Sequence, residues 1–153
     1  MRMGIDVGGT KTAAVLLDAR GTVVGQHQVP TVRGEGVVDS VLAAAGRVLG
    51  DAGLGVDRLE GAGLGIPGVV GRDHSTIRDA VHLGIDAFDV GAAVGERLGV
   101  RVLVENDVNA AVLGARHLLD DDSAAFAYLG LGTGIAAGLL LDGAVWRGTT
   151  GVA

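Results

Sequence analysis

The first group of residues suited to chemistry is a glycine turn at residues 6–11, where the sequence reads DVGGTK. The two glycines follow an apolar run, so the backbone can turn tightly and bring N–H groups against an anion without interference from Cβ atoms. The spacing is not that of a P-loop, and an ordinary hairpin turn is the simpler interpretation of two glycines alone. A phosphate site here would use Asp6, Gly8, Gly9, Thr10 and Lys11, with the Asp6 carboxylate holding Mg²⁺ through water.

A second group of polar residues reads ENDVNAA at 105–111, between an apolar run and a helical pattern. Ligands of open α/β sheets collect at the carboxyl ends of strands, so Asn106 and Asp107 stand where substrate contacts are expected. Either side chain would also make a good helix cap, which is a purely structural role. Capping alone does not require three neighbouring polar residues, and both interpretations stay open from this segment.

Two further glycine-rich segments match the dinucleotide-binding pattern, GLGIPG at 63–68 and GTGIAA at 132–137. A Rossmann turn must open a helix, whereas Pro67 opposes a helix after the first segment and a strand pattern follows the second. We therefore reject both matches. The second segment is better interpreted as another phosphate-facing turn between strands, formed by Gly132, Thr133 and Gly134.

The spacing of apolar residues along the chain predicts an α/β fold. The predicted strands of the first part are 3–7, 13–17, 22–29, 59–66 and 100–104. The predicted helices are 36–49, 90–98 and 107–119. Tight turns join the first three strands into an antiparallel meander, and the alternation that follows gives a mixed sheet with crossover helices.

The remaining segments are expected to lie outside that sheet. Residues 69–86 are irregular and polar, which indicates a surface loop. After the acidic run 120–122, the pattern predicts strands at 124–131 and 135–141 and a hairpin at Asp142-Gly143, with no helix to cover them.

Composition excludes several classes of protein. Of the 153 residues, 48% are hydrophobic and 20% charged, which is typical of a globular chain. The net charge of −6 and the single lysine, Lys11, make nucleic acid and anionic membranes poor partners. The absence of cysteine excludes disulfides and thiolate zinc sites in this chain, and the four histidines lack metal-ligand spacing. Without a spanning apolar run or a signal-peptide pattern, we expect a cytoplasmic protein.

Three motifs stand in order along the chain, namely DVGGTK at 6–11, ENDVNAA at 105–111 and LGTGIAAG at 131–138. Their order and spacing, together with GIPG at 65–68, resemble the ROK family of bacterial sugar kinases and regulators, and its glucokinase-like members in particular. The resemblance covers nearly the whole chain. It implies the actin-like ATPase (ribonuclease H-like) fold, with ATP and a sugar bound in a cleft between two lobes.

The resemblance also implies lobes and residue roles. The first lobe would span 1–119, with a linker at 120–123 and the first strands of the second lobe at 124–153. The turns at 6–11 and 132–134 match the family's phosphate loops for ATP and Mg²⁺. Asn106 matches a ligand of sugar hydroxyls, Gly68 matches a loop whose backbone approaches the sugar, and Asp107 matches the catalytic base.

Several positions depart from the family pattern. Ala136 stands where the second loop usually has glycine, while His82 and Ile85 stand where the family often has Asn and Trp, which leaves the sugar's identity open.

Family members continue beyond the position of Ala153 into a Glu-x-x-His segment, a structural zinc site and the adenine-binding lobe. We therefore expect the front part of a hexose kinase, with glucose as the first candidate, little turnover by itself and a homodimer in the full-length form. A sugar-responsive transcriptional regulator and a catalytically dead sugar-binding or assembly domain are the alternatives.

Overall fold

The computed structural model describes residues 1–131 and 135–149. The contacts divide the chain into two compact units, Met1–Glu105 and Asn106–Ala153. The predicted linker at 120–123 lies within the second unit, so the division into lobes stays a prediction.

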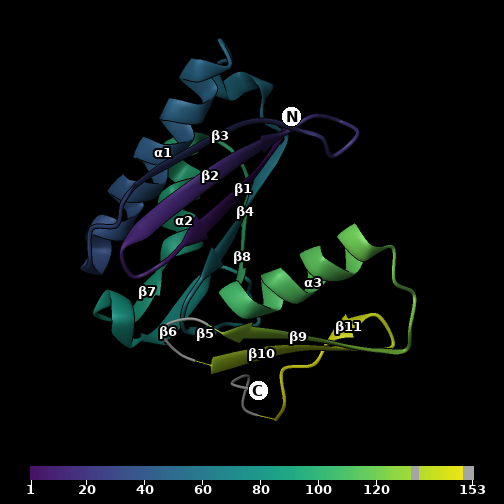
Figure 1. The fold of residues 1–153 in the computed structure, drawn as a ribbon. Helices are drawn as coiled ribbons and strands as arrows, with labels where there is room; N and C mark the ends of the chain where they lie inside the picture. Colours follow the sequence, from purple (N-terminus) through teal and green to yellow (C-terminus); the bar gives the residue numbers. More distant parts are fainter. Residues whose placement is uncertain (132–134, 150–153) are drawn as a thin grey trace. The chain divides into compact units, whose positions relative to one another are not determined.

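The first unit is built on a five-stranded mixed sheet (Figure 1). Its strand order is β3-β2-β1-β4-β8, with bounds Val23–Pro30, Lys11–Leu17, Arg2–Val7, Gly61–Ile66 and Val102–Asn106. β1 pairs antiparallel with β2 and parallel with β4, while β2 pairs antiparallel with β3. The predicted meander and mixed sheet are therefore confirmed.

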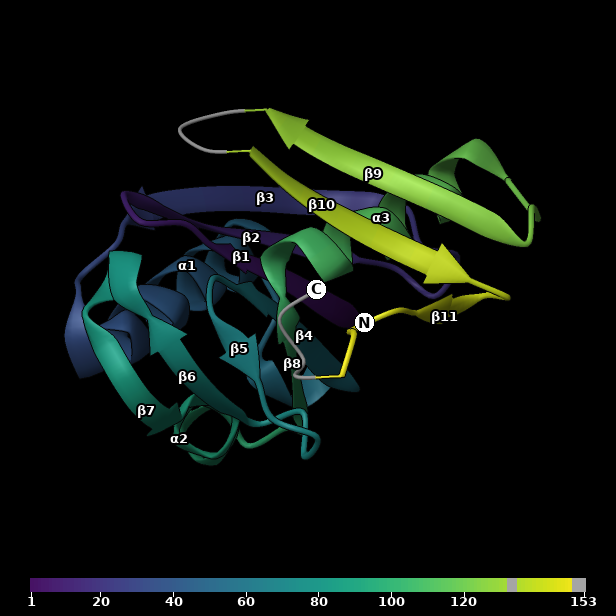
Figure 2. The same cartoon turned by 90° about the horizontal axis from the view of Figure 1, so that it is seen from below.

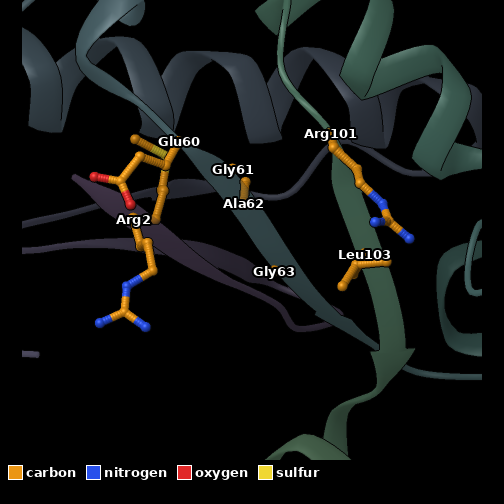
Figure 3. A pocket seen from close by; sticks show the side chains of 8 residues that line it. Arg2, Glu60, Gly61, Ala62, Gly63, Arg101 and Leu103 are labelled. Atoms are coloured by element: carbon orange, nitrogen blue, oxygen red, sulfur yellow. The ribbon is translucent and has the colours of Figure 1, made fainter. Parts of the chain in front are cut away.

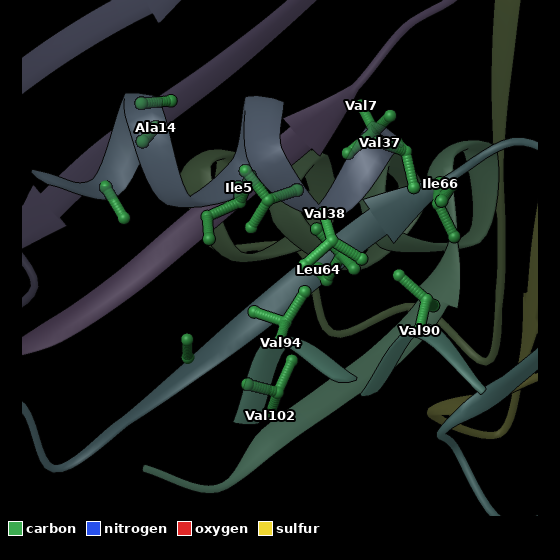
Figure 4. Packing of buried hydrophobic residues seen from close by; sticks show 14 of the residues in the cluster. Ile5, Val7, Ala14, Val37, Val38, Leu64, Ile66, Val90, Val94 and Val102 are labelled. Carbon is green, nitrogen blue, oxygen red and sulfur yellow. The ribbon is translucent and has the colours of Figure 1, made fainter. Parts of the chain in front are cut away.

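Helices α1 (Val37–Asp51) and α2 (Val90–Leu98) contact each other and cover one face of this sheet. Alternate residues of β1 point into the core beneath them, and its intervening residues, such as Asp6, face the other way. Figure 4 shows the aliphatic side chains that fill this layer, among them Leu64 and Val94. α2 begins where the Asp89 carboxylate accepts a hydrogen bond from the Ala92 amide, and it ends at Gly99, whose φ is 69°.

A small second sheet follows β4, and the expectation of an irregular loop at 69–86 was wrong. β5 (Val69–Val70), β6 (Thr76–Ala80) and β7 (Ile85–Asp89) pair in that order as antiparallel strands (Figure 2). The buried apolar residues of this segment are two or three positions apart, with polar and charged residues between them. The segment therefore has no continuous apolar run that would predict a strand. These buried residues are Ile77, Ala80, Leu83 and Ile85.

Three short 3₁₀ helices complete the first unit. Their bounds are Gly34–Gly36 for η1, Val56–Arg58 for η2 and Val81–Leu83 for η3. None of the described helices is long and apolar enough to cross a membrane.

The second unit is a helix packed on a hairpin. Helix α3 spans Asp107–Leu119, β9 Ala125–Leu131, β10 Ile135–Leu141 and β11 Ala144–Val145. The predicted turn is confirmed, with φ values of 49° at Asp142 and 78° at Gly143, as a tight hairpin requires. The expectation that no helix covers this hairpin was wrong, because α3 packs against both β9 and β10.

Gly138 of β10 is the point of close approach in this second unit. A Cβ atom there would lie 2.6 Å from the Val108 carbonyl oxygen and 3.0 Å from Val112 Cβ. We expect Gly138→Ala to push helix and hairpin apart and to cost about 1–3 kcal/mol of unfolding free energy. Urea unfolding would measure it. The control is Gly114→Ala on helix α3, where an added Cβ atom meets nothing within 4 Å and should be stabilising. Equal destabilisation by the two substitutions would contradict the close packing of β10 against α3.

Candidate active site

The glycine turn links β1 to β2, and its backbone is fixed at both ends. The Gly8 amide donates a hydrogen bond of 2.8 Å to the Lys11 carbonyl, and the Thr10 carbonyl accepts one of 3.0 Å from the Thr31 amide. A Cβ atom on Gly8 would lie only 3.1 Å from the Lys11 carbonyl oxygen, which explains glycine there. Because the Gly8 amide is engaged, the donors available to an anion are the Gly9 and Thr10 amides, the exposed Thr10 hydroxyl and the exposed Lys11 ammonium.

Asp6 precedes this turn on the sheet face away from α1 and α2, and its residue is exposed. Its neighbours across the sheet are Ala13 on β2 and Gly65 on β4, so small residues flank the carboxylate on both sides. No cluster of three or more acidic, histidine or cysteine side chains suited to a metal occurs among the described residues. A single carboxylate beside a phosphate turn fits Mg²⁺, which keeps several waters and takes its other ligands from phosphates.

Gly68 follows the end of β4 and packs closely against strand β6 of the small sheet. Its φ of 118° is a conformation that residues with a side chain rarely adopt. A Cβ atom would lie 2.8 Å from the Arg78 carbonyl oxygen and 3.0 Å from Ala80 Cβ. The loop after β4 is therefore held against β6 by the backbone itself.

His82 also lies beside the glycine turn. The sequence did not predict this neighbour. His82 belongs to η3, and its Cβ lies 3.9 Å from where a Cβ on Gly9 would stand. The only sequence signal was its departure from the family pattern, because the spacing of the histidines suggests no site.

The junction of β8 and α3 carries Asn106 and Asp107. The Asn106 Oδ1 accepts hydrogen bonds from the Val108 amide at 3.0 Å and the Asn109 amide at 3.2 Å, so Asn106 is the helix cap. Asp107 Oδ1 accepts from the Val108 amide at 2.9 Å. In the part of the chain that the structure describes, the second carboxylate oxygen of Asp107 accepts no hydrogen bond. Asn109, which the sequence did not single out, is only 4% exposed.

The glycine turn and the Gly68 loop lie at one edge of the first unit's sheet. β1 and β4 are parallel, and β8 runs in the same direction as β4 (Figure 3). Their carboxyl ends therefore share an edge, which places the glycine turn, the Gly68 loop and the end of β8 on the same side of the sheet. Gly132, Thr133 and Gly134 lie outside the described residues.

A cavity of about 370 Å³ lies at the other end of these strands, away from the glycine turn and the Gly68 loop (Figure 3). The cavity is lined by the charged residues Arg2, Glu60 and Arg101. Its floor is formed by Gly61, Ala62 and Gly63. The floor carries no side chain larger than a methyl group and no group suited to phosphoryl transfer. We therefore assign the candidate site to the carboxyl edge.

Comparison with known proteins identifies the family and the fold. Residues 2–153 match the ROK family. A glucokinase from Streptomyces coelicolor is 33% identical over all of this chain and 47% of its own length. The crystal structure of a ROK family glucokinase from Streptomyces griseus in complex with glucose and AMPPNP superposes with a TM-score of 0.88 at 31% identity, over 99% of this chain and 48% of that one. A xylose repressor from Caldicellulosiruptor bescii is 28% identical over 61% of this chain and 24% of its own length.

These likenesses settle the fold and the family. The chain spans about half the length of the curated glucokinase it matches. Its fold is the actin-like ATPase fold of the ROK sugar kinases. Since the family match runs over almost every residue, the chain belongs to the ROK family.

Proposed function

We propose that the protein carrying this chain transfers the γ-phosphoryl group of ATP to a hydroxyl group of a hexose, with glucose as the first candidate. The observation that carries the proposal is the likeness, over 99% of this chain, to a glucokinase structure that holds glucose and AMPPNP. The glycine turn and the junction at Asn106 and Asp107 supply groups of the right chemistry.

On the nucleotide side, the glycine turn binds phosphate. The Gly9 and Thr10 amides and the Thr10 hydroxyl donate hydrogen bonds to phosphate oxygens, and Lys11 adds positive charge. Asp6 would hold Mg²⁺ through water, and the ion would supply positive charge against the negative charge of the phosphates. Gly132, Thr133 and Gly134 form the second phosphate turn in this proposal, which rests on the resemblance.

On the sugar side, Asn106 and the Gly68 backbone orient the hydroxyl groups. The free carboxylate oxygen of Asp107 accepts the proton of the attacking hydroxyl group. The sugar oxygen then bonds to the γ-phosphorus while the bond from that phosphorus to the bridging oxygen breaks, and ADP leaves with the electron pair. Because the other oxygen of Asp107 is held by the Val108 amide at 2.9 Å, the carboxylate keeps a fixed orientation as it takes the proton.

The alternative is a sugar-responsive regulator, which the match to a xylose repressor favours. Such a protein would bind a sugar without transferring phosphate and would change its DNA affinity in response. The net charge of −6 over this chain does not favour a DNA contact within these residues.

The test is an assay of ADP formation by the full-length protein with ATP·Mg²⁺ and a panel of hexoses that includes glucose and N-acetylglucosamine. We expect ADP and sugar phosphate in equal amounts with at least one hexose. Sugar-dependent DNA binding without ADP formation would overturn the proposal in favour of the regulator. The homodimer and the cytoplasmic location remain predictions.

Residues 1–153 by themselves are expected to turn over slowly or not at all. The chain spans 47% of the matched glucokinase, and the resemblance puts the adenine contacts and further sugar ligands outside these residues. In the same assay, we expect at least a ~10³-fold lower rate than for the full-length protein, because positioning supplies much of the acceleration of phosphoryl transfer. A rate within tenfold of the full-length protein would show that the adenine and sugar contacts are complete within this chain.

A further inference from the structure

His74 lies between β5 and β6 with a left-handed backbone, at a φ of 52°. Residues with a side chain seldom adopt this conformation, although histidine tolerates it better than most. Such a conformation persists when the surrounding contacts hold it in place. The contacts that His74 makes therefore indicate which interactions this backbone conformation allows.

His74 pairs with the free edge of β8. The Val104 amide donates a hydrogen bond of 2.8 Å to the His74 carbonyl, and the His74 Nδ1 lies 3.2 Å from the Val104 carbonyl oxygen. A carbonyl only accepts, so Nδ1 carries the proton and donates. Since β8 is the edge strand of the sheet, His74 acts like one residue of a further strand, with its ring nitrogen in place of a backbone amide.

The same nitrogen also faces a carboxylate. His74 Nδ1 lies 3.7 Å from Glu105 Oε2, and the Glu105 side chain is only 16% exposed. One imidazole therefore contacts two successive residues of β8. These are the last two residues of the first unit, and Asn106 and Asp107 follow them directly in the chain.

The turn that carries His74 is itself well braced. Asp73 Oδ1 accepts hydrogen bonds of 3.0 Å from both the Ser75 and Thr76 amides, and its Oδ2 accepts one of 2.7 Å from the Thr76 hydroxyl. The hydrogen bond from the Thr76 hydroxyl, with the two from the amides, lowers the pKa of the Asp73 carboxyl below its ordinary value. The imidazole is thus presented to β8 from an ordered turn.

We propose that His74 is a positioning residue for phosphoryl transfer, fixing through Val104 and Glu105 the end of β8 from which Asn106 and Asp107 follow. The proposal rests on the proposed function of this site. Asp107 is three residues beyond Val104, so a small shift of the strand end moves the catalytic carboxylate. A misplacement of about 1 Å can cost ~10²-fold in rate.

Three substitutions separate the donor from the backbone conformation. His74→Asn places an N–H donor at the position of Nδ1 and tolerates a positive φ. His74→Gly keeps the backbone conformation but removes the donor. His74→Asp has the shape of the asparagine but only accepts, so it faces the Val104 carbonyl and the Glu105 carboxylate without a hydrogen bond.

The experiment measures kcat and KM of the full-length variants together with amide hydrogen exchange at Val104. We expect His74→Asn to stay within about twofold of the wild-type kcat, His74→Gly to lose about 5–20-fold and His74→Asp to lose more, with the KM for ATP unchanged. Exchange at Val104 should quicken in the same order. His117→Asn, at an exposed histidine, serves as the control and should change nothing.

Two outcomes would contradict the role of His74, and they can be told apart. If all three variants keep the wild-type kcat, His74 does not position the site, although the proposed kinase stands. If the wild-type protein forms no sugar-dependent ADP while its Val104 amide remains protected from exchange, the proposed function fails, and the catalytic role of His74 fails with it.

Discussion

Replacing Asp107 with asparagine is expected to lower the kcat for sugar phosphorylation by about 10²–10⁴-fold, the usual contribution of a general base. The amide cannot accept the proton of the attacking hydroxyl group. Its oxygen can still accept the hydrogen bond that Asp107 takes from the Val108 amide at 2.9 Å. We therefore expect the KM for sugar and the urea midpoint to change little, and steady-state kinetics with urea unfolding would measure both.

The matched control for this substitution is Asp122→Asn. Asp122 is an exposed residue in the acidic run after α3, so its loss of charge should leave kcat unchanged. If the Asp107 variant phosphorylated sugar at the wild-type rate, Asp107 would serve only the start of α3. A loss of both activity and stability would likewise assign it a structural role.

Replacing Gly68 with alanine is expected to cost about 2–4 kcal/mol of unfolding free energy. The φ of 118° strains any residue with a side chain, and the added Cβ would lie 2.8 Å from the Arg78 carbonyl oxygen. Relief of this contact must move the loop after β4, so we also expect the KM for sugar to rise. Urea unfolding and sugar titration would measure the two effects.

Gly34→Ala separates the two causes of that destabilisation. Gly34 has a φ of 65° but open space around it, so the variant carries backbone strain without a collision. We expect it to cost about 1–2 kcal/mol, with unchanged sugar binding. Equal losses for the two variants would contradict the close contact between Gly68 and β6.

The strongly patterned elements could be predicted from sequence. α2 has the predicted bounds Val90–Leu98, with Gly99 closing it, and α3 has the predicted bounds Asp107–Leu119. In both, apolar residues recur at helical spacing and a polar residue begins the helix. β10 also has its predicted bounds, Ile135–Leu141.

The small sheet β5-β6-β7 could not be predicted, because its apolar residues are few and separated by charged ones. Its strands become recognisable only through pairing, as in Ile77 opposite Phe88. At the β8–α3 junction, the sequence also could not separate the roles of two neighbouring residues. Both Asn106 and Asp107 could cap α3 from sequence, and the structure gives the cap to Asn106.

The contacts of His74 and His82 were equally hidden. His74 contacts Val104, and His82 lies beside Gly9, close to where a Cβ on that glycine would stand. Both neighbours are far away in the sequence, so no local spacing reveals them. The function of the glycine turn was also ambiguous from its own residues. A Gly-Gly hairpin is common, and its meaning came from the order of three motifs along the chain.

Phosphoryl transfer to a hexose is tested most directly by the rate of ADP formation from ATP·Mg²⁺ by the full-length protein, with and without each hexose of a panel. We predict that at least one hexose raises the rate at least ~10²-fold over the sugar-free rate, with one sugar phosphate formed per ADP and the increase lost in Asp107→Asn. A protein that binds ATP and a hexose, yet forms ADP no faster with any sugar than without it, would contradict the proposed kinase activity.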